Sequence, residues 1–189
     1  LSMTNEPVRS ATRHAIKVAK ENGAILSFDP NIRESLWKDM EDAGAQMAYG
    51  LSICDILKIS DNEIQWFSRK EDYTEGIHML QQTYQIPLIL LSMGKDGSRA
   101  YYKDMLVGVL AFLQKNTIET TGAGDTFGAC RLHHILKYGL DNLAERQLKE
   151  MLRFANAAAS IITTRKGVLR VMPSVEKIQN IKNYFERIS

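Results

Sequence analysis

Apolar residues along the chain first recur with the spacing of an amphipathic helix. Ala15, Ile16 and Ala19 share one face of a predicted helix that begins near Pro7 and runs to about Asn22. A short helix is expected after Asp61, which can cap it. The same spacing predicts further helices over residues 38–52, 73–84, 125–138, 144–163 and 175–188.

Three short runs are apolar throughout instead of alternating, and they predict buried strands. They cover residues 24–29, 55–60 and 88–92, at even spacing, with one or two predicted helices in each gap. This rhythm is typical of βα units, so we expect a parallel sheet covered by helices. Residues 98–112 depart from it and predict two antiparallel strands that turn around Lys103 and Asp104. The predicted fold class is therefore α/β with a mostly parallel sheet.

The composition excludes several classes of protein. The chain has 189 residues, of which 44% are hydrophobic and 24% charged, and no apolar run approaches the roughly 20 residues of a membrane helix. The net charge of +2 is spread among acids and bases, so neither nucleic acid nor a membrane is an expected partner. Two distant cysteines and no secretory signal at the first residues favour the cytoplasm.

Polar residues gather directly after the predicted strands. In an open parallel sheet, ligands bind at the carboxyl ends of strands, where loops and helix N-termini meet. We therefore expect one shared site that includes the following residues: Asp29, Asn31 and Arg33 after the first strand, Ser60, Asp61, Asn62 and Glu63 after the second, and Ser92, Gly94, Lys95 and Gly97 after the third.

The segment KNTIETTGAGDTFGA, residues 115–129, places two glycines before an acid and a predicted helix. Gly122 and Gly124 allow a tight turn that aims backbone N–H groups outward, and the helix dipole adds positive potential, which favours an anion. Asp125 would repel a resting phosphate, but it suits a base that takes a proton from an attacking hydroxyl. The plain alternative is that Asp125 only caps the helix. The segment matches neither a Walker loop nor a dinucleotide fingerprint.

Several motifs occur together in one order, namely SFDPNIRESLW, LKISDNE, LLSMGKDGS, TTGAGDTF and RFANAAASIITTRKGVLRVMPS. In this order they resemble the ribokinase, or PfkB, family of carbohydrate kinases and especially its fructokinase-like members, over about residues 27–174. The resemblance implies a ribokinase-like three-layer α/β/α fold without the family's N-terminal strands and β lid. Residues 1–189 would then be the C-terminal part of a single kinase domain, carrying nucleotide binding and phosphoryl transfer.

The resemblance also implies roles for individual residues. Asp125 would be the catalytic base, and Gly122, Ala123 and Gly124 would form the anion hole. Residues expected to bind the nucleotide are Ser92, Gly94, Gly97, Thr121 and Asn156.

Metal and sugar ligands follow from the same resemblance. Glu63 matches the acid of the family's NxxE motif, which holds Mg²⁺ through water, although Ser60 stands at the Asn position. Glu119 and Gly167 resemble a monovalent-cation site for K⁺. Asn31 and Arg33 would lie near the sugar.

Each assignment also has a plain structural alternative. Asn31 and Arg33 can form a surface turn, Glu63 can begin a helix, and Asn156 can be a polar position on an alanine-rich packing face.

The predicted function is ATP-dependent transfer of the γ-phosphate to a hydroxyl of a small sugar, with fructose first and Mg²⁺ as cofactor. Two alternatives stay open: another acceptor, such as ribose, a nucleoside or a sugar acid, and a non-catalytic nucleotide-binding or assembly fragment. We expect the chain alone to be inactive, and a homodimer is a candidate only for the full-length protein.

Overall fold

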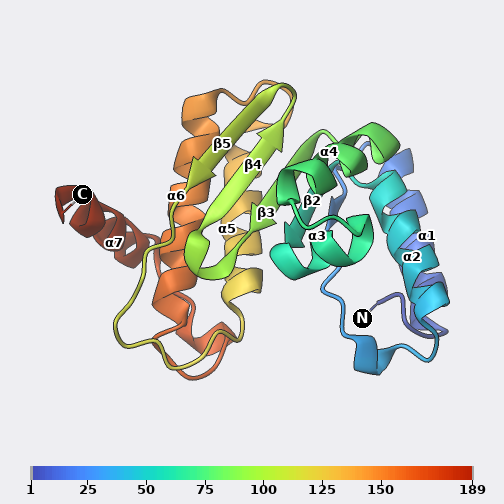
Figure 1. The fold of residues 1–189 in the computed structure, drawn as a ribbon, viewed down its shortest axis with the longest axis horizontal. Helices are drawn as coiled ribbons and strands as arrows, with labels where there is room; N and C mark the ends of the chain where they lie inside the picture. The colour runs from blue at the N-terminus through green and yellow to red at the C-terminus, as the bar shows by residue number, and fades with distance from the viewer. Residues whose placement is uncertain (1, 189) are drawn as a thin grey trace. The chain divides into compact units, whose positions relative to one another are not determined.

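The structure of the chain is a computed structural model that describes residues 2–188 (Figure 1). It divides into two compact units, Leu1–Leu91 and Ser92–Ser189. In chain order, the first unit contains α1 (Val8–Glu21), β1 (Ser27–Phe28), the 3₁₀ turn η1 (Glu34–Leu36), α2 (Met40–Ile53), β2 (Ile56–Ser60), α3 (Asp61–Ser68), α4 (Tyr73–Tyr84) and most of β3 (Leu88–Ser92). The second contains η2 (Gly94–Asp96), β4 (Ser98–Tyr102), β5 (Met105–Val109), α5 (Ala123–Tyr138), α6 (Glu145–Ile162), η3 (Leu169–Val171) and α7 (Val175–Ile188).

The strands of the first unit lie in the order β1, β2, β3, and β1 pairs in parallel with β2. The predicted first strand, residues 24–29, is too long, because only Ser27 and Phe28 are in strand conformation. The carboxylate of Asp55 accepts the Leu26 N–H at 2.7 Å and so takes the bond that would extend the strand. The apolar residues of β2 and β3 are buried and form the core of this unit.

Helix α3 begins one residue earlier than its sequence indicates. Ser60, and not Asp61, is the N-cap, and Ser60 and Glu63 form a reciprocal capping box that satisfies backbone N–H groups at the helix start. The neighbouring α4 has the predicted bounds and is capped by Asp72, whose side chain accepts the Glu75 N–H. Both helices therefore begin with a side-chain cap, and α3 follows β2 directly.

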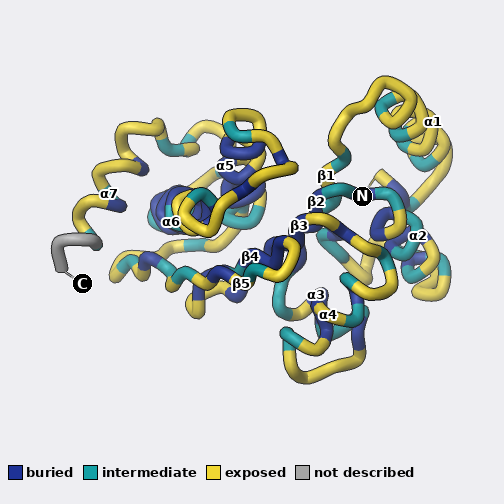
Figure 2. The backbone as a smooth tube through the Cα atoms, turned by 90° about the horizontal axis from the view of Figure 1, so that it is seen from above, coloured by how far each residue is buried: buried dark blue, intermediate teal, exposed yellow. Residues whose placement is uncertain are grey.

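The second unit is built on the antiparallel hairpin of β4 and β5, which turns at Lys103 and Asp104 as predicted. Helix α6 packs on both strands and along α5, and Figure 1 shows the two helices behind the hairpin. Eleven of the residues of α6 are buried, so in Figure 2 this helix is mostly dark blue whereas α7 is largely exposed. The core of this unit therefore lies between the hairpin and α6.

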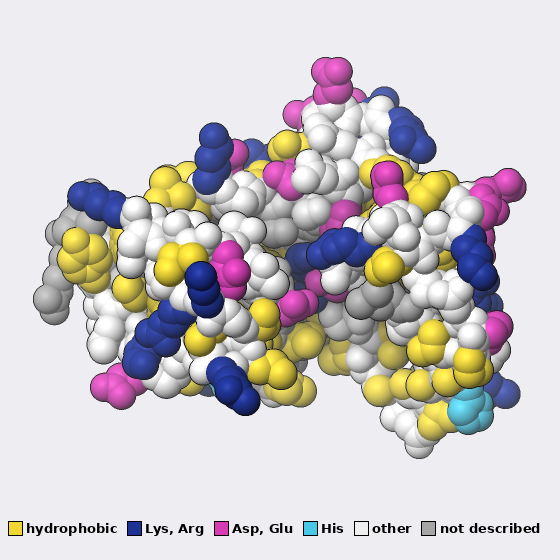
Figure 3. Space-filling model, turned by 90° about the horizontal axis from the view of Figure 1, so that it is seen from below, with side chains coloured by type: hydrophobic (Ala, Val, Ile, Leu, Met, Phe, Trp, Pro, Cys, Tyr) yellow, Lys and Arg dark blue, Asp and Glu magenta, His cyan; other side chains and the backbone are white. Residues whose placement is uncertain are grey.

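The surface carries charges of both signs. On the face drawn in Figure 3, basic and acidic side chains are interspersed among polar and apolar ones. Within residues 2–188, no helix combines the length and the apolar character that crossing a membrane requires.

Candidate nucleotide and phosphoryl-transfer site

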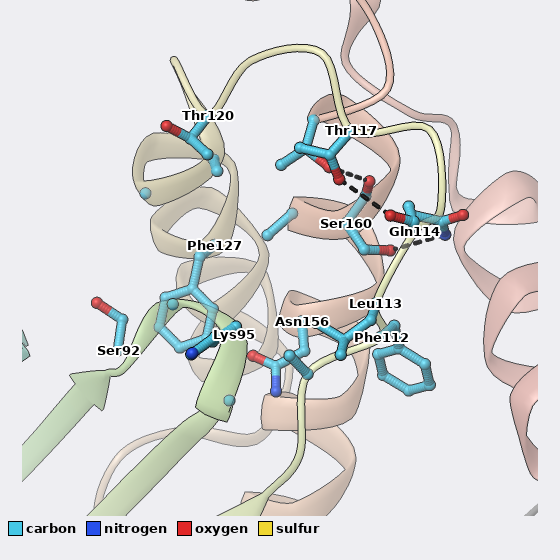
Figure 4. Close-up of a pocket in the computed structure, with 17 residues that line it drawn as sticks. Ser92, Lys95, Phe112, Leu113, Gln114, Thr117, Thr120, Phe127, Asn156 and Ser160 are labelled. Atoms are coloured by element: carbon cyan, nitrogen blue, oxygen red, sulfur yellow. Dashed lines mark hydrogen bonds between the residues drawn. The ribbon is translucent and has the colours of Figure 1, made fainter.

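The second unit contains a cavity of about 320 Å³ that is formed by segments far apart in the sequence. The loop after β3, the segment after β5, the first turns of α5 and one face of α6 all line it (Figure 4). Seven residues that the sequence analysis placed in the expected site line this cavity, namely Ser92, Gly94, Lys95, Gly97, Ala123, Gly124 and Asn156. The structure therefore brings together four of the five predicted nucleotide residues and two of the three predicted anion-hole residues.

The loop after β3 is fixed in place by its own backbone. Met93 N–H donates to Gly97 O at 2.9 Å, and Asp96 N–H donates to Met93 O at 2.9 Å. Gly97 has a φ of +97°, and a Cβ there would overlap the carbonyl oxygen of Val109. Only glycine fits this position, so the loop can lie against the end of β5.

The glycine turn before α5 leaves backbone amides available. Gly122, with a φ of +78°, is the N-cap and packs closely on Val168, where an added Cβ would come within 2.6 Å. Ala123 N–H donates to Thr120 O at 3.1 Å. Within residues 2–188, the N–H groups of Gly124 and Asp125 have no hydrogen-bond acceptor. Two unpaired amides at a helix N-terminus form a site for an anion.

Asp125 is the third residue of α5 and is exposed. The N-cap position belongs to Gly122, and no side chain caps this helix, so the structure does not support the alternative in which Asp125 is only a cap. The carboxylate is free to accept a proton beside the two amides. Its role as catalytic base stays a prediction.

Asn156 lines the cavity, but protein groups occupy its side chain. Its Oδ1 accepts the Ser98 hydroxyl at 2.9 Å, and its Nδ2 donates to Val109 O at 3.3 Å and Leu110 O at 3.2 Å. The residue joins α6 to both strands of the hairpin. Asn156 therefore shapes the wall of the cavity. Its direct contact with a nucleotide stays a prediction.

The two segments proposed for a monovalent cation meet in the structure. Gly167 N–H donates to Glu119 Oε1 at 3.0 Å, and Ile118 N–H donates to Thr163 O at 2.8 Å. Neither Glu119, Gly167 nor Thr121 lines the cavity, whereas Thr120 does. The hydrogen bond joins the two segments, and a role of Glu119 and Gly167 in holding K⁺ stays a prediction.

Glu63, the predicted magnesium residue, lies in the first unit and is buried. Its Oε1 accepts the Ile32 N–H, and its Oε2 accepts both the N–H and the hydroxyl of Ser60, each at 2.9 Å. These bonds support the alternative in which Glu63 starts a helix, and they also tie that helix to the loop after β1. One lone pair of Oε1 is left that could accept a metal-bound water. A role of Glu63 with Mg²⁺ stays a prediction.

The loop after β1 rests on an ion pair that sequence reasoning missed. Buried Lys58 on β2 lies 3.2 Å from the Asp29 carboxylate. Asn31 has a φ of +45°, and the exposed Arg33 donates to the adjacent Ile32 O at 2.9 Å. Both features are those of a surface turn, and a sugar role for Asn31 and Arg33 stays a prediction. A lysine inside an apolar strand was the signal for the ion pair.

The two cysteines are buried and provide no nucleophile. Burial raises the pKa of Cys54 to about 12 and that of Cys130 to about 11. Neither thiol is ionised near neutral pH, and the thiolate is the reactive form.

A family model described as pfkB family carbohydrate kinase matches residues 3–175. The chain belongs to the pfkB family of carbohydrate kinases. Fructokinase-1 of Zea mays is 34% identical over 178 residues, which are 94% of this chain and 55% of that protein. A relative from Arabidopsis thaliana, provisionally named fructokinase-8, is 36% identical over 99% of this chain and 89% of its own length.

Solved structures show the fold of this pfkB member. Fructokinase from Vibrio cholerae O395, in its fructose-, ADP- and calcium-bound form, is 28% identical with a TM-score of 0.87, covering 95% of this chain and 57% of that one. Fructokinase with bound ATP from Xylella fastidiosa, at 24% identity and a TM-score of 0.85, shares the fold. The predicted ribokinase-like α/β fold is confirmed. This chain spans only a little over half the length of these solved proteins and of most of its curated relatives. That both units belong to one kinase domain stays a prediction.

Proposed function

We propose that this chain forms the nucleotide and phosphoryl-transfer portion of an ATP-dependent sugar kinase, with fructose as the first acceptor. The observation that carries the proposal is the cavity of the second unit, which Gly124 lines at the start of α5. Within residues 2–188, the N–H groups of Gly124 and of the adjacent Asp125 have no acceptor. Its volume and its mixed apolar and polar walls suit a nucleotide, and the helix N-terminus that borders it suits the phosphates.

In the proposed reaction, the acceptor hydroxyl oxygen bonds to the γ-phosphorus while the bond from that phosphorus to the β,γ-bridging oxygen breaks. The amides of Gly124 and Asp125 stabilise the negative charge on the transferring group, and the carboxylate of Asp125 accepts the hydroxyl proton. ADP and the sugar phosphate are the products. Mg²⁺, when bound, offsets charge on the nucleotide, and Glu63 would orient its water ligands.

Fructose is favoured because the Zea mays and Arabidopsis thaliana relatives are named fructokinases and the Vibrio cholerae enzyme is seen with fructose and ADP. The chain spans about half the length of most of these relatives. We therefore propose that the isolated chain binds nucleotide but turns over little sugar. The same partial span supports a second candidate, a non-catalytic nucleotide-binding fragment.

Asp125→Asn tests this proposal against a matched control. Asp104→Asn removes the same charge from the exposed turn between β4 and β5, away from the cavity. Calorimetry should show ADP binding to the wild-type chain, with affinity kept in both variants. In a coupled ADP-release assay with fructose, any wild-type turnover should fall by about 10²–10⁴-fold in Asp125→Asn and not in Asp104→Asn.

Three results would count against parts of this account. A wild-type chain without ADP affinity would refute nucleotide binding. Undiminished turnover in Asp125→Asn would refute its role as base. Robust turnover by the wild-type chain would refute the inactive-fragment expectation and exclude the non-catalytic candidate.

A further inference from the structure

Lys95 is the only charged residue among the described residues that line the cavity. It lies on η2, in the loop between β3 and β4, and Figure 4 shows its side chain at the same end of the cavity as Ser92 and Phe127. The other wall residues are apolar, hydroxylic or amide side chains and glycines. One positive charge therefore faces a site that has no negative side chain in its lining.

The backbone holds Lys95 in position while its ammonium stays available. Its neighbours Met93, Asp96 and Gly97 are joined by the backbone hydrogen bonds of the loop, so its Cα is fixed. Within residues 2–188, Lys95 makes neither an ion pair nor a hydrogen bond through its side chain. Most exposed lysines have no partner either, so the distinguishing feature is the place of this one in the wall of a cavity.

A nucleotide brings several negative charges into this cavity, and the unpaired amides of Gly124 and Asp125 supply only partial positive charge. The Asp125 carboxylate opposes the phosphates. A lysine ammonium is a compact point charge that binds phosphate oxygens through charge-assisted hydrogen bonds. Lys95 is the one side chain of the lining that can supply it.

We propose that Lys95 binds the phosphate chain of the nucleotide and gives the site its preference for a nucleoside diphosphate or triphosphate over the nucleoside. This inference rests on the proposed function, because it presumes that the cavity holds a nucleotide. It adds a binding residue that acts on the charge of the phosphates.

The test compares two ligands and four proteins. Affinities for ADP and for adenosine are measured by competition with a fluorescent nucleotide on the wild-type chain, Lys95→Gln, Lys95→Arg and Lys149→Gln. Lys149 is an exposed lysine of α6 outside the cavity lining, so its variant removes the same charge elsewhere in the unit. Lys95→Gln should weaken ADP binding about tenfold, as expected for one hydrogen bond to a charged group, and change adenosine binding less than about twofold.

The controls should separate charge from structure. Lys95→Arg should keep most of the ADP affinity, Lys149→Gln should match the wild type, and added salt should weaken ADP binding less in Lys95→Gln than in the wild type. Equal ADP affinity in Lys95→Gln and the wild type, or equal losses for ADP and adenosine, would overturn the inference alone. A wild-type chain that binds no ADP would overturn the proposed function, and the inference with it.

Discussion

Asn156→Ala tests whether one buried amide holds the wall of the cavity. Asn156 accepts a hydrogen bond from Ser98 and donates two to the carbonyls at the end of β5. Alanine removes all three and leaves the Ser98 hydroxyl, itself only 1% exposed, without this acceptor. The substitution therefore removes the hydrogen bonds that Asn156 makes from α6 to both strands of the hairpin.

The expected loss of stability follows from these bonds. A hydrogen bond contributes about 1 kcal/mol net, so three give about 3 kcal/mol. Alanine is the better helix former by about 0.5 kcal/mol, which offsets a small part of this loss. Asn180→Ala, at an exposed position of α7, measures that offset alone.

Urea unfolding followed by circular dichroism gives the comparison. With a slope of about 2 kcal/mol per molar urea, the Asn156→Ala midpoint should fall by more than about 1 M, while Asn180→Ala should change little. ADP affinity should fall as well, because the end of β5 loses its two hydrogen bonds to Asn156 in the wall of the cavity. A loss below about 1 kcal/mol relative to Asn180→Ala would refute this account of the wall.

Two further predictions concern buried polar groups outside the cavity. Glu63→Gln should lower stability by about 2 kcal/mol in urea unfolding, because an amide cannot accept all three bonds of the buried carboxylate. Glu75→Gln, at the same position of α4 but exposed, should cost less than about 0.5 kcal/mol, and equal losses would contradict the reasoning. Burial lowers the pKa of His134 below its usual 6.5, so protonation favours the unfolded chain, and the stability present above pH 6.5 should be lost as the pH falls through the lowered value. His134→Gln should make the urea midpoint less sensitive to pH between 7 and 5. His78→Gln, an exposed control, should leave that sensitivity unchanged. An unchanged pH dependence in His134→Gln would contradict the role given to His134.

Local patterns predicted much of the fold. The bounds of β3 and α4 and the turn of the hairpin agree with the sequence, since continuous apolar runs and polar turn residues are short-range signals. The predicted first strand was too long, because the Asp55 side chain accepts the Leu26 N–H that would have extended it. The cap of α3 was also predicted wrongly, because Ser60 and not Asp61 forms reciprocal hydrogen bonds with Glu63. The spacing of Ser60 and Glu63 in the sequence could have indicated this capping box.

The candidate site was predicted only in part, for a physical reason. Glycines at a helix start are readable as an anion site, and Gly124 lies where that pattern placed it. The partners of Asn156 are far away along the chain, with Ser98 lying 58 residues before it, so no local pattern shows that its amide is occupied. The engagement of the Ala123 amide by Thr120 likewise required the folded turn.

The most direct test of the central claim is the response of backbone amides to ADP in two-dimensional nuclear magnetic resonance. The account predicts the largest chemical-shift changes at the amides of Gly124 and Asp125, whose N–H groups at the start of α5 have no acceptor within residues 2–188. Gly139, at the other end of the same helix, already donates to Ile135 O at 2.8 Å and should not move. Saturable ADP binding that leaves the amides of Gly124 and Asp125 unchanged would contradict the claim that this helix start holds the phosphates.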